Sequence, residues 1–126
     1  MTKHIRHGIG SVRPYIHGPT SLLPFLADVF GARELERHEF GPDSFHVELC
    51  IGDSVVAIEA GALPPDVAAW TSSVYVYVED VDAAFSRAIN LGAESVAEPT
   101  DKPYRERQAG FRDAAGNMWW VGTYLG

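Results

Sequence analysis

The sequence contains little of what several classes of protein require. Its single cysteine, Cys50, excludes an internal disulfide and any zinc site built from cysteines. Only 10 Lys and Arg stand against 17 Asp and Glu, and the net charge of -7 argues against nucleic acid or an anionic membrane as a partner. No apolar run reaches the length of a membrane span, and residues 1–4 begin no secretory apolar segment. We therefore expect a cytoplasmic protein.

Several sequence landmarks occur twice, in the same order. Residues 11–16 (SVRPYI) return at residues 73–78 (SVYVYV), and the Gly-Ala pair at residues 31–32 returns at residues 92–93. Residues 52–56 (GDSVV) are echoed by residues 116–120 (GNMWW). A preserved order of strand, helix end and turn indicates two copies of one supersecondary unit.

The length of 126 residues, of which 46% are hydrophobic, supports one domain with a single core. We expect this domain to cover residues 1–126, with a first module at about 11–60, a linker at about 61–71 and a second module at about 72–125.

Each module is predicted to run strand, helix, then strands, from its apolar periodicity and its turn residues. In the first module the elements are a strand at 11–16, a helix at 21–30, a looser strand at 34–40, and a hairpin of 45–51 and 54–59. In the second they are a strand at 73–78, a helix from an Asp80 cap to Gly92, a strand at 94–98, a loop at 99–107, and strands at 109–112 and 118–124.

This arrangement resembles the vicinal oxygen chelate superfamily, also called the glyoxalase, bleomycin-resistance and dioxygenase group. The resemblance extends from Ser11 to Tyr124 and is most specific at residues 78–84 and 111–120. It implies an α+β fold of two βαβββ modules whose curved sheets form cups. It also implies a homodimer, with modules paired either within a chain or between chains.

Some positions refine the resemblance. The turn before residues 116–117 has Asp113 and Ala114 where the family usually has Asp-Pro. Residues 25–31, 46–49 and 52–54 are similar to the branch typified by the PhnB-like proteins.

In such modules one sheet face packs against the helix and the other lines the cup, so alternation along each strand sorts the side chains. Valines of the 73–78 strand are assigned to the helix side and its tyrosines to the cup. The candidate ligand-binding residues are Arg13, Tyr15, His46, Glu48, Glu59, Tyr75, Tyr77, Arg107, Met118, Trp120 and Tyr124.

Metal-dependent members of the group carry His, Gln or Glu ligands on the first and last strands of each module. Carried over, those positions fall on or within a residue of Ser11, Glu59, Ser73 and Trp120. Only Glu59 has the chemistry of a ligand, and one carboxylate with two hydroxyls and an indole is a poor donor set for a divalent ion. We therefore expect neither a metal nor a cofactor.

Three polar residues leave an alternative open. His46 and Glu48 point to the same side of one strand, and Glu59 lies on its neighbour. They form either an atypical metal site of two carboxylates and one imidazole, or a hydrogen-bonded polar patch in a wet cup. We favour the polar patch.

Aromatic rings dominate the expected cup. Tyr15, Tyr75, Tyr77 and Trp120 offer faces for stacking a planar ligand, worth about 0.5 to 1.5 kcal/mol per pair beyond burial. The first hypothesis is a metal-free binding protein that sequesters an aromatic or polycyclic molecule, similar to the bleomycin- and mitomycin-resistance members. The alternative is a metal-dependent lyase, isomerase or dioxygenase. A third is a regulatory or structural homodimer with a vestigial cup.

Overall fold

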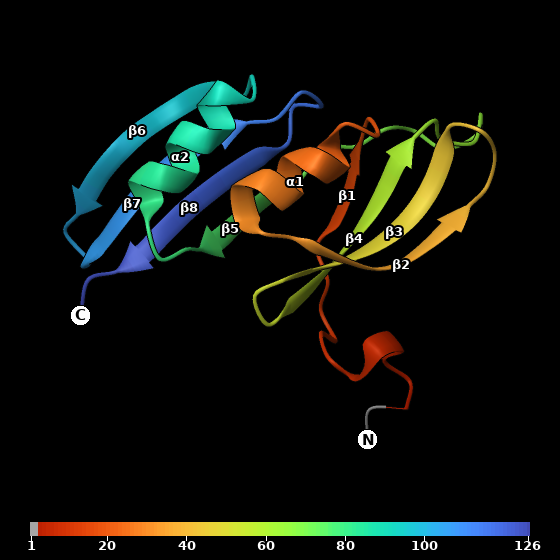
Figure 1. The fold of residues 1–126 in the computed structure, drawn as a ribbon, viewed down its shortest axis with the longest axis horizontal. Coiled ribbons are helices and arrows are strands. Elements are labelled where there is room, and N and C mark those ends of the chain that lie inside the picture. The colour runs from red at the N-terminus through yellow and green to blue at the C-terminus, as the bar shows by residue number, and fades with distance from the viewer. Residues whose placement is uncertain (1–2) are drawn as a thin grey trace.

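The computed structural model describes residues 3–126 and contains two modules of the same design (Figure 1). Residues 1 and 2, part of the start segment considered above, lie outside the described residues. A short turn, η1 (Arg6–Gly8), precedes module 1, which consists of β1 (Tyr15–Gly18), α1 (Leu22–Phe30), β2 (Arg33–Glu39), β3 (Ser44–Ile51) and β4 (Ser54–Gly61). Module 2 consists of β5 (Ser73–Tyr77), α2 (Val81–Asn90), β6 (Glu94–Lys102), β7 (Glu106–Arg112) and β8 (Met118–Tyr124).

The two sheets have the same topology. Sheet 1 has the order β1-β4-β3-β2 and sheet 2 the order β5-β8-β7-β6. In each, the first strand pairs in parallel with the last, and the remaining pairs are antiparallel. The predicted α+β fold of two βαβββ modules is confirmed, and the sequence repeat is a structural repeat.

The start of α2 and the end of α1 lie where the sequence predicts them. The Asp80 side chain accepts a hydrogen bond from the Ala83 amide at 3.0 Å and caps the N-terminus of α2. Gly31 adopts a left-handed conformation, with φ of 66°, and its amide bonds the Ala27 carbonyl at the end of α1.

One hydrophobic core serves both modules. Phe111 and Trp119 of sheet 2 are fully buried, and the ring of Phe30 from α1 lies 5.3 Å from that of Trp119. The helix of module 1 therefore packs against the sheet of module 2, and α1 and α2 lie side by side (Figure 1). The other face of each sheet turns away from this core. We call the surface of sheet 1 that carries His46, Glu48 and Glu59 open face 1, and the surface of sheet 2 that carries Tyr75, Tyr77 and Trp120 open face 2.

Buried amide hydrogen bonds fix one module against the other. Asn117, which follows the turn between β7 and β8, donates from Nδ2 to the His17 carbonyl at 2.9 Å. Its Oδ1 accepts from the Ser72 amide at 2.8 Å, and its Nδ2 also donates to Asp113 at 3.0 Å. Asn117 thus joins β1, the end of the linker and the β7–β8 turn.

Two predicted boundaries were wrong. The segment 99–107, expected as a loop, is mostly strand, because β6 continues to Lys102 and β7 begins at Glu106. Pro99 is tolerated because β6 is an edge strand, and its pairing with β7 shifts between Ala97 and Thr100.

The strand expected at residues 11–16 begins only at Tyr15. Gly10, with φ of 79°, lies in an irregular segment that leads into β1.

Among the described residues, no helix is long and apolar enough to span a membrane.

Candidate functional site

Open face 1 carries a continuous polar network. Arg13 donates from Nη1 to Glu48 at 2.5 Å, and the other oxygen of Glu48 faces His46 Nε2 at 2.6 Å. His46 Nδ1 faces Glu59 Oε2 at 2.9 Å, and that same oxygen accepts a hydrogen bond from the Tyr15 hydroxyl at 2.8 Å. A protonated imidazole satisfies both carboxylates at once, because each ring nitrogen then donates.

The network controls ionisation at its centre. Burial lowers the pKa of His46, but the hydrogen bonds and charges of Glu59 and Glu48 outweigh it, so the pKa is raised overall. Burial raises the pKa of Tyr15, and its bond to Glu59 raises it further. The geometry therefore favours an imidazolium held between two carboxylates, beside a neutral phenol.

The segment before β1, residues 5–13, is held against sheet 1, and we call it the strap. The Arg13 guanidinium donates to the carbonyls of Gly10 at 3.0 Å and Ile9 at 2.9 Å, and also to that of Arg6. Arg6 in turn pairs with Glu36 on β2. One arginine thus folds the strap and ties it to the polar network.

The strap covers part of open face 1. Val55, on the same side of β4 as Glu59, is only 1% exposed, and Glu48 on β3 is 4% exposed. A Cβ placed on Gly10 of the strap would lie 3.5 Å from the Val55 side chain. This end of open face 1 is therefore closed by the protein's own chain.

The linker closes the opposite side of the network. Trp70 donates from Nε1 to the Tyr15 carbonyl at 2.8 Å, and its ring centroid lies 5.0 Å from that of Tyr15 and 5.5 Å from that of His17. An adjoining cavity of about 370 Å³ is lined mainly by apolar side chains, with Glu59 at its edge. Tyr15 therefore belongs to the network and also lines the apolar cavity.

Open face 2 is aromatic. The hydroxyls of Tyr75 and Tyr77 on β5 each donate to one oxygen of Glu106 on β7, both at 2.5 Å. The two phenol rings lie 5.4 Å apart at an angle of 60°. Tyr75 is 40% exposed and Tyr77 64% exposed, so both rings face solvent in the isolated chain.

Two glycines leave space on this face for aromatic rings to lie close to the backbone of the sheet. A Cβ on Gly122 of β8 would overlap the Tyr75 phenol, and a Cβ on Gly110 of β7 would lie 2.7 Å from the Trp120 ring. Because glycine has no side chain, both rings can lie down along the sheet. Their positions are specified by residues on neighbouring strands.

The charges on open face 2 are fixed by the same contacts. Hydrogen bonds from Tyr75 and then Tyr77 lower the pKa of Glu106. Burial, and then the bond to Glu106, raise the pKa of Tyr75 to about 12. At neutral pH this face therefore presents a carboxylate held by two neutral phenols.

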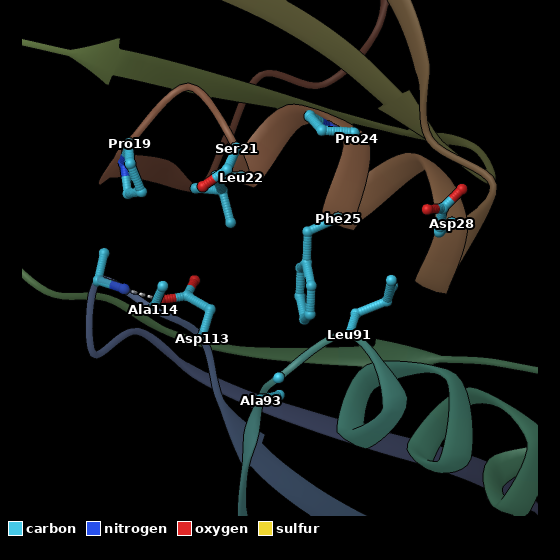
Figure 2. Close-up of a pocket in the computed structure, with 12 residues that line it drawn as sticks. Pro19, Ser21, Leu22, Pro24, Phe25, Asp28, Leu91, Ala93, Asp113 and Ala114 are labelled. Carbon is cyan, nitrogen blue, oxygen red and sulfur yellow. Dashed lines mark hydrogen bonds between the residues drawn. The ribbon is translucent and has the colours of Figure 1, made fainter.

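A separate cavity of about 180 Å³ lies on the helix side of the sheets (Figure 2). It is bordered by Leu22 and Phe25 from α1 and by Leu91 after α2, with Asp113 on its wall. Asp113 already accepts a hydrogen bond from the Ala115 amide at 2.9 Å, drawn dashed in Figure 2. This cavity belongs to neither open face.

Comparison with known families identifies the fold. The sequence profile described as Glyoxalase/Bleomycin resistance protein/Dioxygenase superfamily matches residues 16–121. The chain belongs to this superfamily. No curated protein sequence matches the chain at a significant level.

Several solved structures resemble the chain over nearly its whole length. TioX from Micromonospora sp. ML1 is 26% identical, with a TM-score of 0.70, and the match covers 90% of this chain and 95% of that one. A superfamily enzyme from Burkholderia phytofirmans PsJN is 19% identical, with a TM-score of 0.72 and coverage of 93% and 100%. The fosfomycin resistance protein FosX from Listeria monocytogenes is 18% identical, with a TM-score of 0.65 and coverage of 91% and 93%. The last two show the fold alone.

The residues of this superfamily member do not fit a divalent metal. The His46 ring lies between Glu48 and Glu59, and each ring nitrogen faces a different carboxylate, so the three side chains do not converge on one point. Arg13 occupies the remaining oxygen of Glu48. Within residues 3–126, no group of three or more His, Cys, Asp or Glu side chains has the arrangement of a metal site.

The candidate binding residues lie on the two open faces, except Arg107, which lies on the helix side of sheet 2. Those on open face 1 are Arg13, Tyr15, His46, Glu48 and Glu59. Those on sheet 2 that share the side of Tyr75 are Tyr77, Met118, Trp120 and Tyr124. Arg107 lies on the helix side of sheet 2 and donates to Asp82 of α2 at 2.7 Å and to Asp101 at 2.9 Å. Their role in binding stays a prediction.

Glu106 and Gln108 were not predicted from the sequence as residues of this face; the Gln108 side-chain amide lies 3.3 Å from the Tyr75 hydroxyl. The signal was present in the sequence, because Glu106, Gln108 and Gly110 alternate along β7 with Arg107, Ala109 and Phe111, which lie on the helix side. The alternation was not recognised because residues up to 107 were predicted to form a loop.

Proposed function

We propose that the chain is a metal-free small-molecule binding protein that sequesters a planar aromatic or polycyclic ligand. The observation that carries the proposal is open face 2, where Tyr75 and Trp120 lie along the sheet over glycines. Such rings present their faces to solvent and can stack a planar molecule. Drug resistance, which is the described role of the structural relative FosX, is a role that such binding would support.

We further propose that the protein acts as a homodimer. The two open faces of one chain turn away from the shared core, so neither closes the other. Ring-bearing side chains remain exposed on open face 2, and polar groups line open face 1. A second copy with twofold symmetry would bring face 1 of one chain over face 2 of its partner, forming two equal cups.

Three further assignments belong to the same proposal. The PhnB-like branch is supported by residues 25–31, 46–49 and 52–54. A cytoplasmic location and a single domain over residues 1–126 also stay predictions.

The test is titration of tag-free protein with a set of planar polycyclic dyes, followed by tryptophan quenching and calorimetry. We expect at least one dye to bind, and Trp120→Ala to weaken its affinity about tenfold or more through lost stacking and burial. Trp120→Phe, which keeps an aromatic face, should lose less. Unchanged affinity in Trp120→Ala would contradict the assignment.

Shared cups can be tested by mixing two inactive variants. If one cup combines face 1 of one chain with face 2 of its partner, each mixed dimer of His46→Ala and Trp120→Ala has one intact cup, and an equimolar mixture regains about one quarter of the wild-type sites. If each cup is built within a single chain, the mixture recovers none.

The alternative function is a metal-dependent enzyme of the superfamily. Metal content of tag-free protein, measured by mass spectrometry before and after incubation with zinc, nickel, manganese and ferrous iron, decides between the two. Near-stoichiometric retention that His46→Ala abolishes would support the enzyme. Substoichiometric metal throughout is the outcome that we expect.

A further inference from the structure

Glu106 occupies a distinctive place on open face 2. Its two oxygens accept the hydroxyl hydrogens of Tyr75 and Tyr77, so the carboxylate lies where both phenol rings end. Lys102 lies opposite Glu106 across the β6–β7 pair, yet among the described residues Glu106 forms no ion pair. A negative charge surrounded by aromatic rings is left without a cation of the protein's own.

The carboxylates of open face 1 are different. Glu48 is matched by Arg13 and by His46, and Glu59 is matched by His46. The acidic groups of face 1 are therefore neutralised within the chain. Glu106 on open face 2, by contrast, has no such partner among the described residues.

The tyrosine hydroxyls hold this carboxylate in place without neutralising it, because phenols are neutral donors. The two rings are tilted by 60° and lie 5.4 Å apart, forming two walls beside the charge. A cation within about 6 Å of such ring centroids gains affinity from the ring faces, worth about threefold to thirtyfold. A neutral molecule of the same shape gains only the stacking.

We propose that open face 2 selects planar aromatic ligands that carry a positive charge, with Glu106 as the counter-ion and Tyr75 and Tyr77 as the walls around the charged group. This inference rests on the proposed function, because it names the ligand class of the same site. Trp120 then stacks the planar part of the ligand.

The experiment compares 9-aminoacridine with acridine at mildly alkaline pH, where the first is a cation and the second is neutral with the same three-ring plane. Calorimetry on the full-length protein should show a preference of about tenfold for the cation. Glu106→Gln keeps the shape of the side chain and removes its charge. We expect it to abolish the preference while changing acridine affinity less than about twofold.

Glu94→Gln is the matched control. Glu94 is also on sheet 2, at the far end of the β6–β7 pair, where it contacts Arg112. We expect this variant to keep the preference, which separates a local counter-ion from the general negative field of the protein. Equal loss in Glu94→Gln and Glu106→Gln would overturn the inference.

The remaining outcomes separate the inference from the function on which it rests. Equal binding of both dyes to the wild-type protein would overturn the cation preference and leave the aromatic cup in place. Binding of neither dye, with no other planar ligand bound, would overturn both. Tyr77→Phe, which keeps the ring but no longer holds the carboxylate, should lower the preference without abolishing acridine binding.

Discussion

The ring of Tyr75 lies where a side chain at Gly122 would otherwise stand, and its hydroxyl reaches across to Glu106 at 2.5 Å. Tyr75 starts from β5, Gly122 lies on β8 and Glu106 lies on β7, so one side chain spans three strands. The absence of a Cβ at position 122 makes this path possible. Gly122 thus leaves the space that allows the Tyr75 ring to reach Glu106 on open face 2.

Gly122→Ala should displace Tyr75 from the sheet. The added methyl group overlaps the phenol, so we expect the free energy of unfolding to fall by about 1 to 3 kcal/mol. The pKa of Tyr75, about 12 in the native protein, should move down toward its ordinary value as the bond to Glu106 is lost. Urea unfolding and spectrophotometric tyrosine titration measure the two effects. In a Tyr75→Ala background the same substitution should cost much less, and an equal cost would contradict the overlap.

His46 should make stability depend on pH. Burial lowers its pKa, but Glu59 and Glu48 raise it more, so the folded protein binds the proton more tightly than the unfolded chain, whose histidine pKa is about 6.5. The stabilisation is therefore complete below about pH 6.5 and is lost as pH rises through the elevated pKa of the folded state. The difference in unfolding free energy between wild type and His46→Gln should shrink over that range. His4→Gln, at an exposed position, should leave the profile unchanged.

Asn117→Ala should loosen the junction between modules. The substitution removes bonds to Asp113, to the part-buried His17 carbonyl and to the part-buried Ser72 amide, and leaves a cavity at a fully buried position. We expect a loss of about 2 to 4 kcal/mol in unfolding free energy, measured in urea. Asn90→Ala, at the exposed end of α2, should change stability by less than about 0.5 kcal/mol. Equal effects of the two variants would contradict the role of Asn117.

Arg13→Met should release the strap. It removes the bonds to the carbonyls of Gly10 and Ile9 and the ion pair with Glu48. We expect faster hydrogen exchange across residues 5–13 and around Val55, with a stability loss of about 1 to 3 kcal/mol. Arg33→Met, an exposed position on β2, is the control. An unchanged exchange pattern in Arg13→Met would show that the strap is held by other contacts.

Local chemistry made much of the fold predictable from the sequence. Asp80 and Gly31 mark helix ends through their own backbone and capping preferences, and the alternation of Tyr75 and Val76 separates the two faces of a strand. These signals depend on neighbouring residues only. They place the helices and the open faces without knowledge of tertiary contacts.

The remaining features of the fold and of the candidate site depend on contacts between residues that are distant in sequence. Pro99 is compatible with a strand only because β6 lies at the edge of its sheet, which no local pattern reveals. A loop at residues 99–107 has no sheet face, so the sequence does not predict that Glu106 lies on the side of Tyr75 and Arg107 on the helix side. Alternation along the strands was enough to group His46, Glu48 and Glu59, but the register of β3 against β4, which sets His46 opposite Glu59, comes only from the structure.

The strap makes two copies of one architectural unit unequal. Sheets related by duplication would present two equivalent surfaces, but residues 5–13 fill part of one from within the same chain, burying Val55. The corresponding surface of module 2 keeps Tyr77 largely exposed. A short stretch of irregular backbone therefore makes the two repeats unequal, because the chain itself covers part of open face 1 and leaves the rings of open face 2 exposed.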